Sequence, residues 1–487
     1  MKKRWIALTL VAMTMTGLLA GCGQKKADTT KSGTKSEADA GKKDLPVLKW
    51  VTVGGGKPDN YDAWQKKVND YIGPKIGAHV DVDVISWGDW DAKRNTIVTA
   101  NEPFDLIFGN GGTFAKDVKL GALADITEFL GADSKLKKLI PADYWKALTI
   151  DGKCYGVPTY KDSSITQYFV WDKAMLDKYE VKDFEKINSL EAAEPVLKKI
   201  TDGEKKASFP LAKTGVYQIL DTYDSFGLGL PFIGVKYNDK TGKVVNKLEQ
   251  ADVQAELAAL KKMFDGGVIN QDAFTTAEVQ PAGTICSIAQ GWPMAAKTAW
   301  GPARGAEAVV SRYTPTMLNN DSVLGSVNSV SANSKHKKEA VALLELINDD
   351  SKLRDMFFYG EPDVDFKYVD GKVERINKEW KMAGYTQGTF FNVTQTVDTK
   401  ENQWDEVKKL NEEAEPSVLL GFQLDNSSIE AQIANMTQIW ASDSAELLTG
   451  VKDPKTAIEE INKKMKEAGM DDVIKECQKQ VDAFLAK

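Results

Sequence analysis

The chain has 487 residues, of which 42% are hydrophobic and 27% charged, and its formal net charge is −7. An acidic chain without a run of basic residues repels a phosphate backbone, so we expect no nucleic-acid partner. This length exceeds what one hydrophobic core usually supports, which predicts two domains.

The N-terminus has the layout of an export signal. Basic residues 2–4 precede an apolar stretch, residues 5–19, that ends in small residues. The LAGC sequence at residues 19–22 has the spacing that lipoprotein signal peptidase requires in the bacterial lipoproteins that this segment resembles. We predict that residues 1–21 are a signal peptide and that Cys22 becomes a lipidated N-terminus. The alternative, a plain transmembrane anchor, needs about 20 continuous apolar residues, and threonines interrupt this stretch.

Residues 22–46 are predicted to form a flexible tether. They contain mainly Lys, Ser, Thr, Gly and Asp, so burial cannot offset the entropy of ordering them. A lipid on Cys22 would anchor the protein to the outer face of the cytoplasmic membrane, with the folded body outside the cell. We expect this location in a Gram-positive bacterium.

From Val47 the pattern alternates between strand and helix. Residues 47–53 and 79–86 read as strands, residues 60–72 as an amphipathic helix, and residues 104–110 as a third strand. This alternation predicts an α/β fold with a parallel sheet covered on both faces. Ligands of such sheets bind beyond the carboxyl ends of the strands, which selects the loops 54–61, 86–90 and 109–113.

A second region is predicted from about Lys153 to Ser311. It contains a helix with one apolar face, ended by Gly266-Gly267. Residues 309–318 then predict another strand that crosses between domains, and residues 338–348 predict a helix with an apolar stripe. Helices are expected to dominate the remainder.

Catalytic and metal-binding patterns are scarce. The two histidines, His79 and His336, are far apart, and no zinc-ligand spacing or well-placed Ser-His-Asp group can be assembled with them. We expect no metal, no cofactor and no catalytic residue. Paired carboxylates for glycoside hydrolysis stay open, because 70 acidic residues offer many pairs.

Aromatic residues in polar loops favour a carbohydrate ligand. An indole face stacks on the C–H patches of a sugar while Asp, Asn and Lys bind its hydroxyl groups. The candidates are Trp87, Trp90, Tyr160, Lys161, Asp162, Tyr223, Asp224, Trp292 and Trp300. Core packing is the better interpretation for Trp50, Trp64, Trp145 and Trp440, which lie in strand or helix patterns.

Only five arginines lie outside the predicted signal peptide. Because arginine suits bidentate capture of carboxylate and phosphate, this scarcity favours a neutral ligand over an amino acid, a peptide or a phosphate ester. Lys57 and Lys161 leave an acidic sugar open. The three cysteines after Cys22, an odd number, are expected to be buried small hydrophobes.

The succession of these segments resembles the family 1 extracellular solute-binding proteins, the maltose-binding-protein relatives. The resemblance spans about residues 47–360 and is carried by the LAGC motif, LADITEFL, DGKCYGVPTYKDSSITQYFVWDKAML and AQGWPMAAKTAW. Beyond it, YGEPDVDFKYVDGKVE and GFQLDNSSIEAQIANMTQIW resemble the extended C-terminal region of LipO-like lipoproteins of Gram-positive bacteria.

The resemblance implies a two-lobe, periplasmic-binding-protein-like fold of type II. It implies an N-terminal lobe of residues 47–158 plus 312–358 and a C-terminal lobe of residues 159–311 plus 359–487. The hinge strands would cross near residues 157–161 and 312–315, and the lobes would close on a ligand between them.

The resemblance also implies site residues. Lys57, Asp59 and Asn60 would form a polar first loop. Asn110, beside Gly111, would stand where relatives have an acidic residue that binds the sugar. Trp292 would stack on the sugar. Glu361 and Phe422 are predicted from the C-terminal region, because each follows a glycine at an element boundary. Asn at position 110 and the lack of a second Trp after Trp292 depart from the maltose-type pattern, so maltodextrin specificity is not implied.

The function implied is that of a monomeric receptor that delivers a sugar, expected to be an oligosaccharide, to an ABC permease. The alternatives are a secreted carbohydrate-active enzyme, which needs two carboxylates flanking a sugar bond, and an amino-acid or peptide receptor, which needs an arginine or a helix N-terminus at the ligand carboxylate.

Overall fold

The computed structural model describes residues 45–227 and 229–486. The predicted signal peptide, Cys22 and most of the predicted tether lie outside these residues. The fold confirms a mixed α/β class with two large hydrophobic cores. The first core draws on residues 48–160 and 318–357, and the second on residues 169–286 and 419–481.

A five-stranded sheet of order β2-β1-β3-β14-β6 carries the first core. β1 (Val47–Gly54) pairs in parallel with β2 (His79–Ser86) and β3 (Leu106–Gly109), as the alternating pattern predicts. β14 (Val327–Val330) enters antiparallel to both β3 and β6 (Val157–Pro158). The carboxyl ends of the three parallel strands share one edge of this sheet, where the predicted ligand loops begin.

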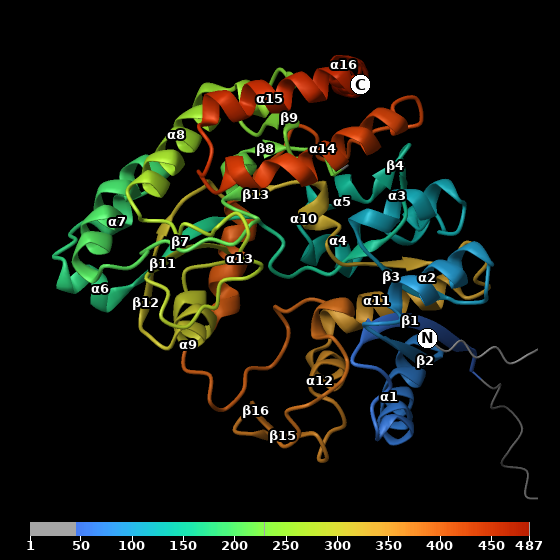
Figure 1. Cartoon of the computed structure of the whole chain (residues 1–487). Coiled ribbons are helices and arrows are strands. Elements are labelled where there is room, and N and C mark those ends of the chain that lie inside the picture. The colour runs from blue at the N-terminus through green and yellow to red at the C-terminus, as the bar shows by residue number, and fades with distance from the viewer. Residues whose placement is uncertain (1–44, 228, 487) are drawn as a thin grey trace, which may run out of the picture. The chain divides into compact units, whose positions relative to one another are not determined.

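Helices cover this sheet on both faces, because every parallel strand must be followed by a crossover. They are α1 (Tyr61–Ile76), α2 (Trp90–Thr99), α3 (Gly111–Lys119), α4 (Lys135–Leu139), α5 (Tyr144–Ala147), α10 (Asn320–Val323), α11 (Lys337–Asp349) and α12 (Ser351–Tyr359). α1 and α12 lie side by side (Figure 1). Trp50 and Trp64 pack against Phe357 between them, with ring centroids 5.5 and 5.1 Å from its ring. Both tryptophans are fully buried, which confirms the core interpretation.

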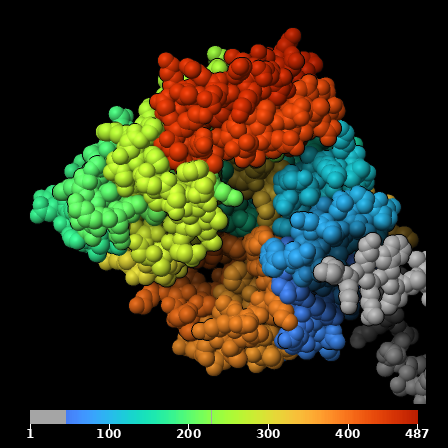
Figure 2. Space-filling view, viewed as in Figure 1, coloured from blue at the N-terminus to red at the C-terminus, as the bar shows by residue number. Residues whose placement is uncertain are grey.

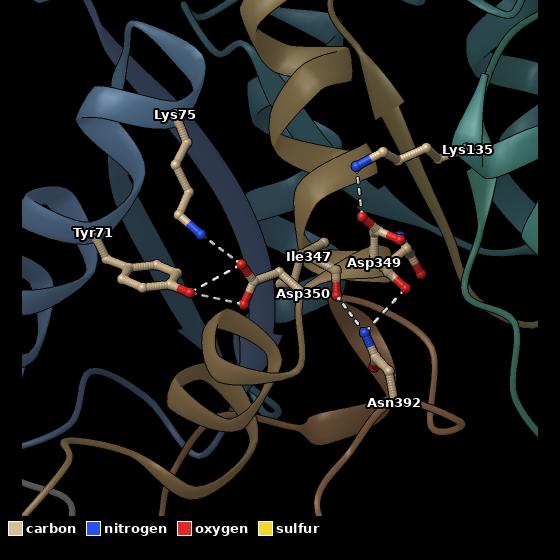
Figure 3. A network of polar contacts seen from close by, with 8 residues as sticks. Tyr71, Lys75, Lys135, Ile347, Asp349, Asp350 and Asn392 are labelled. Carbon is tan, nitrogen blue, oxygen red and sulfur yellow. Dashed lines mark hydrogen bonds and ion pairs between the residues drawn. The ribbon is translucent and has the colours of Figure 1, made fainter. Parts of the chain in front are cut away.

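Asp350 ties α1 to the junction of α11 and α12 (Figure 3). Its carboxylate accepts a hydrogen bond from the backbone N–H of Leu353 and so caps α12. It also accepts from the Tyr71 hydroxyl at 2.9 Å and pairs with the Lys75 ammonium at 2.7 Å. On the other side of the junction, Asn392 donates to the carbonyl oxygens at the end of α11.

The second core is built on antiparallel strands and long helices. β7 (Gln167–Asp172) lies between β11 (Cys286–Gln290) and β12 (Ala308–Arg312), and a second sheet joins β8 (Tyr223–Asp224), β9 (Ile233–Lys236) and β10 (Val244–Asn246). The helices are α6 (Lys173–Lys178), α7 (Leu190–Glu204), α8 (Ala251–Asp265), α9 (Gly301–Arg304), α14 (Glu430–Leu448), α15 (Pro454–Glu467) and α16 (Met470–Leu485). α14, α15 and α16 pack together and form the red cluster in Figure 1.

Three chain segments run between the regions of the two cores, side by side. Ile165 and Met317 exchange backbone hydrogen bonds of 2.8 and 2.9 Å, so the first two segments pair where they cross. β13 (Met317–Leu318) then pairs in parallel with β17 (Glu415–Pro416) of the third segment. The sequence predicts the first two crossings and does not predict the third.

Residues 361–417, termed the 361–417 segment below, connect α12 to the last crossing. The segment contains β15 (Phe366–Val369), β16 (Lys372–Arg375) and α13 (Gln403–Glu413). Met382 lies in the first core, although the predicted lobe boundary at residue 359 assigns everything after it to the C-terminal lobe. The division into lobes stays a prediction.

Candidate functional site

A cavity of about 880 Å³ lies between residues of the two cores. The first turns of α3 and α10 line one side, and the loop after β8 together with residues 419–430 lines the other. In Figure 2 the surface is hollowed between the cyan, yellow-green and red segments. A cavity of this size accepts a ligand of several rings, since small-molecule sites measure about 300–1,000 Å³.

Asp224 and Asp321 line this cavity together with three further acidic residues and two lysines, which are Asp151, Asp425, Glu430, Lys116 and Lys119. Asp224 is buried, and its Oδ2 accepts no hydrogen bond from any described residue. Burial raises the pKa of Asp224, and the pKa of Asp321 is raised by desolvation and by the nearby charge of Asp224. A buried carboxylate oxygen without a donor is unfavourable by about 1–3 kcal/mol, so Oδ2 of Asp224 favours a ligand that supplies a hydroxyl hydrogen.

Glycines let the backbone approach Asp321 from both sides. A Cβ at Gly111 would lie 3.2 Å from Oδ1 of Asp321, and a Cβ at Gly227 would lie 3.0 Å from it. Gly227 also has a φ of +65°, which residues with a Cβ rarely adopt. Near Gly111, the Thr113 and Phe114 amides of α3 donate to the Asn110 carbonyl, so the amides of Gly111 and Gly112 are the ones left without an acceptor within the helix.

Lys247 places a buried ammonium group near the carboxyl groups of Asp221 and Asp224. Its side chain is fully buried and its ammonium donates to the carbonyls of Leu220 and Tyr223 and to the Ser225 hydroxyl. Burial lowers the pKa of Lys247 to about 7, while the charges of Asp221 and Asp224 act in the opposite direction.

Aromatic rings supply the apolar part of the cavity. Phe226 and Phe422 meet edge to face with their centroids 5.9 Å apart, and both line the cavity. Asn320 holds the turn before Phe422, because its side chain donates to the carbonyls of Leu419 and Phe422 and accepts from the Gly421 amide. The predicted Phe422 therefore lies at this cavity together with Gly111 and Asp224.

A second group of predicted residues gathers around Tyr385. Trp87 is 54% exposed and stacks on the Tyr385 ring at 6.2 Å, with 20° between the ring planes. The Lys161 ammonium lies 6.0 Å from the centroid of the same ring and pairs with Asp162 at 2.7 Å. An exposed indole beside a Lys–Asp pair is the combination expected for sugar stacking.

The predicted first loop makes its contacts within the protein. The Asn60 amide donates to Glu361 at 3.1 Å and to Asp365 at 2.9 Å. Glu361 is buried and pairs with a lysine of α1 at 3.0 Å. Asp59 pairs with Lys381 at 2.7 Å, and the Lys57 ammonium lies 4.1 Å from the Tyr61 ring centroid. The structure thus brings Asn60 and Glu361 together, as partners of one another.

Asn110 is exposed at the N-terminal end of α3, where its backbone N–H donates to the Thr113 hydroxyl at 3.3 Å. Asn110 does not line the cavity that the adjacent Gly111 lines, because its side chain takes part in the capping box of α3.

Other predicted aromatic residues are buried or pack on neighbouring rings. Tyr160 is 1% exposed and packs between Tyr144 and Phe391, and the Tyr223 hydroxyl donates to Asp252. Trp90 is buried against Phe108, and Trp300 is half-buried beside Tyr168. Trp292 packs on Trp404 of α13 with centroids 5.8 Å apart.

Sequence reasoning does not find four residues of these groups: Asp321, Phe226, Tyr385 and Trp404. Tyr385 and Trp404 lie in the 361–417 segment, where polar stretches hide the element pattern. The position of Phe226 two residues after the candidate Asp224 is the one signal that could have found it. Nothing in the sequence near Asp321 sets it apart from other acidic residues.

No cluster of three or more His, Cys, Asp or Glu side chains suited to a metal ion occurs in residues 45–227 and 229–486. Within the same residues, no helix is both long and apolar enough to cross a membrane.

The family model described as bacterial extracellular solute-binding protein matches residues 70–360, and a domain of unknown function, DUF3502, matches residues 418–486. A carbohydrate ABC transporter substrate-binding protein of Streptococcus pneumoniae is 28% identical over 99% of both chains. Lipoprotein LipO of Bacillus subtilis is 24% identical over 56% of this chain and 52% of its own length.

Among solved structures, the N-glycan transport solute-binding protein NgtS of Streptococcus pneumoniae is 26% identical and matches with a TM-score of 0.79, over 91% of this chain and 99% of that one. Its complexes with Man1GlcNAc and Man5GlcNAc match with TM-scores of 0.67 and 0.63 over 91% of this chain and 100% and 99% of theirs.

Proposed function

Because this chain belongs to the family of bacterial extracellular solute-binding proteins, we propose that it captures an oligosaccharide outside the cell and delivers it to an ABC permease. The observation that carries the ligand class is the cavity between the two cores. It combines a buried carboxyl whose Oδ2 accepts no hydrogen bond from the described residues, a second carboxyl with a raised pKa and two aromatic rings. Sugar hydroxyls supply the missing donors, and sugar C–H faces pack on the rings.

The similarity to NgtS supports the same ligand class and a closing motion. The TM-score is higher with the NgtS structure that is described without a ligand, 0.79, than with its two oligosaccharide complexes, 0.67 and 0.63. The NgtS chain therefore adopts more than one arrangement. We infer that this chain has the arrangement of the receptor before closure and that a sugar shifts it toward a closed form that the permease recognises.

A thermal-shift screen tests this proposal with a soluble fragment that begins at Lys25. The ligands are mono- and oligosaccharides, uronates, amino acids and peptides, with Man1GlcNAc and Man5GlcNAc among them. A ligand at a hundredfold excess over its dissociation constant stabilises the native state by about 2.7 kcal/mol. A shift with one oligosaccharide class, without loss of that compound, supports the receptor. A shift with peptides alone refutes the carbohydrate ligand, and consumption of the sugar means that the protein is an enzyme.

We also infer that Cys22 carries the lipid that holds the receptor at the membrane surface. The LAGC motif and the similarity to a protein named as a lipoprotein support this inference. In cells fed an alkyne-labelled fatty acid, the native chain should incorporate the label and remain with the membrane. The Cys22→Ser variant should remain unlabelled, and a labelled variant would contradict the inference.

A further inference from the structure

The 361–417 segment lies between the stretches that the two family models match, residues 70–360 and 418–486. It supplies most of a separate cavity of about 630 Å³. The other wall comes from residues 294–298 of the second core region and from the end of α12. This cavity shares no lining residue with the 880 Å³ cavity described above.

Aromatic rings run along this cavity as a continuous row. The Trp404 ring lies 4.6 Å from Phe390, Phe390 lies 5.8 Å from Phe358, and Phe358 lies 5.0 Å from Tyr359. Phe358, Tyr359 and Trp404 line the cavity. Phe358 and Trp404 are half-buried and offer apolar faces to a ligand that enters between the 361–417 segment and the second core region, whereas Tyr359 is only 4% exposed.

In this cavity one buried hydrogen-bond donor has no partner, and charged side chains of opposite sign lie near one another. Arg375 donates through Nη2 to the Lys378 carbonyl at 2.8 Å, but its buried Nε has no partner among the described residues. Lys297 pairs with Glu401 across the cavity at 3.2 Å. The pKa of Asp398 is lowered by the Thr396 hydroxyl, by a backbone hydrogen bond, and by the charges of Lys378 and Arg375. A neutral ligand rich in hydroxyl groups suits this balance better than an ion does.

Both walls of the cavity are held in place. Asn392 donates to the carbonyls of Ile347 and Asn348 and so fixes the 361–417 segment to the end of α11 (Figure 3). On the other side, the Met294 amide donates to Glu406 of α13 at 2.7 Å. A cavity fixed at both walls is preorganised, which reduces the entropy lost when a ligand binds.

We propose that this cavity is a second saccharide site, which holds a neutral sugar residue of the oligosaccharide whose remaining part occupies the cavity between the two cores. In this site the sugar packs on the ring row and a hydroxyl oxygen accepts a hydrogen bond from Nε of Arg375. This inference rests on the proposed function, and it predicts that affinity increases with the length of the oligosaccharide.

Isothermal titration of the Lys25 fragment with Man1GlcNAc and Man5GlcNAc tests the second site. We expect the unsubstituted fragment to bind Man5GlcNAc at least tenfold more tightly. Arg375→Met should remove most of this difference and change the affinity for Man1GlcNAc by less than twofold. Lys367→Met is the matched control, because Lys367 lies on the same hairpin but does not line the cavity, and it should keep the difference.

Three outcomes separate the two proposals. If Arg375→Met keeps the length dependence, or weakens both sugars equally, the second site is refuted while the receptor stands. If the unsubstituted fragment binds neither sugar nor any other saccharide of the screen, the proposed function falls and the second site with it. If Arg375→Met does not fold, a crystal structure of the unsubstituted fragment with Man5GlcNAc decides, and an empty 630 Å³ cavity refutes the inference.

Discussion

Trp87→Ala should weaken sugar binding and leave the fold almost intact. The indole is 54% exposed, and its main contact is the stacked Tyr385 ring at 6.2 Å. A stacked aromatic pair contributes about 0.5–1.5 kcal/mol beyond area burial, so we expect the free energy of unfolding to fall by about 1 kcal/mol. If a sugar stacks on the free face of the indole, its loss removes a similar amount, about 1.4 kcal/mol, which is tenfold in the dissociation constant.

The measurements are isothermal titration with the saccharide that gives the largest thermal shift, and urea unfolding of the same preparations. Phe274→Ala is the control, because Phe274 is also exposed, at 37%, and belongs neither to the group around Tyr385 nor to the lining of the two cavities. It should leave the affinity unchanged. An unchanged affinity in Trp87→Ala would refute the stacking role, and a loss of more than 3 kcal/mol of stability would mean that the ring is structural.

Three further substitutions or treatments follow from the structure. Gly227→Ala should cost about 1–2 kcal/mol of stability, because its φ is +65°, and should weaken sugar binding because the added Cβ meets Asp321, as urea unfolding and titration would measure. Asp350→Asn should lower the free energy of unfolding by about 1–3 kcal/mol at pH 7. The pKa of Asp350 in the folded protein lies below its ordinary value, so the stabilisation by Asp350 is complete above about pH 4 and is lost as the pH falls through the folded pKa. In urea titrations below that pH, the difference in free energy of unfolding between the unsubstituted protein and Asp350→Asn should disappear. Ellman's reagent at pH 8 should find no reactive thiol in the native Lys25 fragment and three after unfolding, because burial raises the pKa of each thiol, to about 11 for Cys154, about 12 for Cys477 and further for Cys286.

The elements with strong periodicity are the ones that the sequence predicts well. The strands at residues 47–53 and 79–86 form β1 and β2 in full register, because alternating or continuous β-branched residues permit little else. The stripe Ala340, Leu343, Leu344 and Ile347 is buried along α11, and Gly266 ends α8 as predicted. The predicted strand at residues 309–318 is divided into β12 and β13, since Pro315 removes a backbone donor in its middle.

The candidate site was less predictable, because its contacts join residues that are distant in the chain. Trp87 meets Tyr385, and Asn60 meets Glu361, across about 300 positions that no local pattern connects. The strand-end rule located Trp87, Asn60 and Gly111 correctly at one edge of the sheet. The rule does not predict that the Asn60 side chain donates hydrogen bonds to two carboxylates, whereas the Trp87 indole remains exposed to solvent.

The third crossing gives the 361–417 segment a role that a two-lobe receptor does not require. The segment is anchored to the first core through Met382 and Asn392, and to the second core region through Glu406 and the Trp292–Trp404 contact. Closing the lobes on a sugar must therefore move or bend this segment along with the hinge strands. A sugar that contacts the segment can bias closure as well as add affinity, since any contact stronger in the closed form shifts the population toward it. Variation of the segment can then change which oligosaccharides trigger closure while the two cores stay the same.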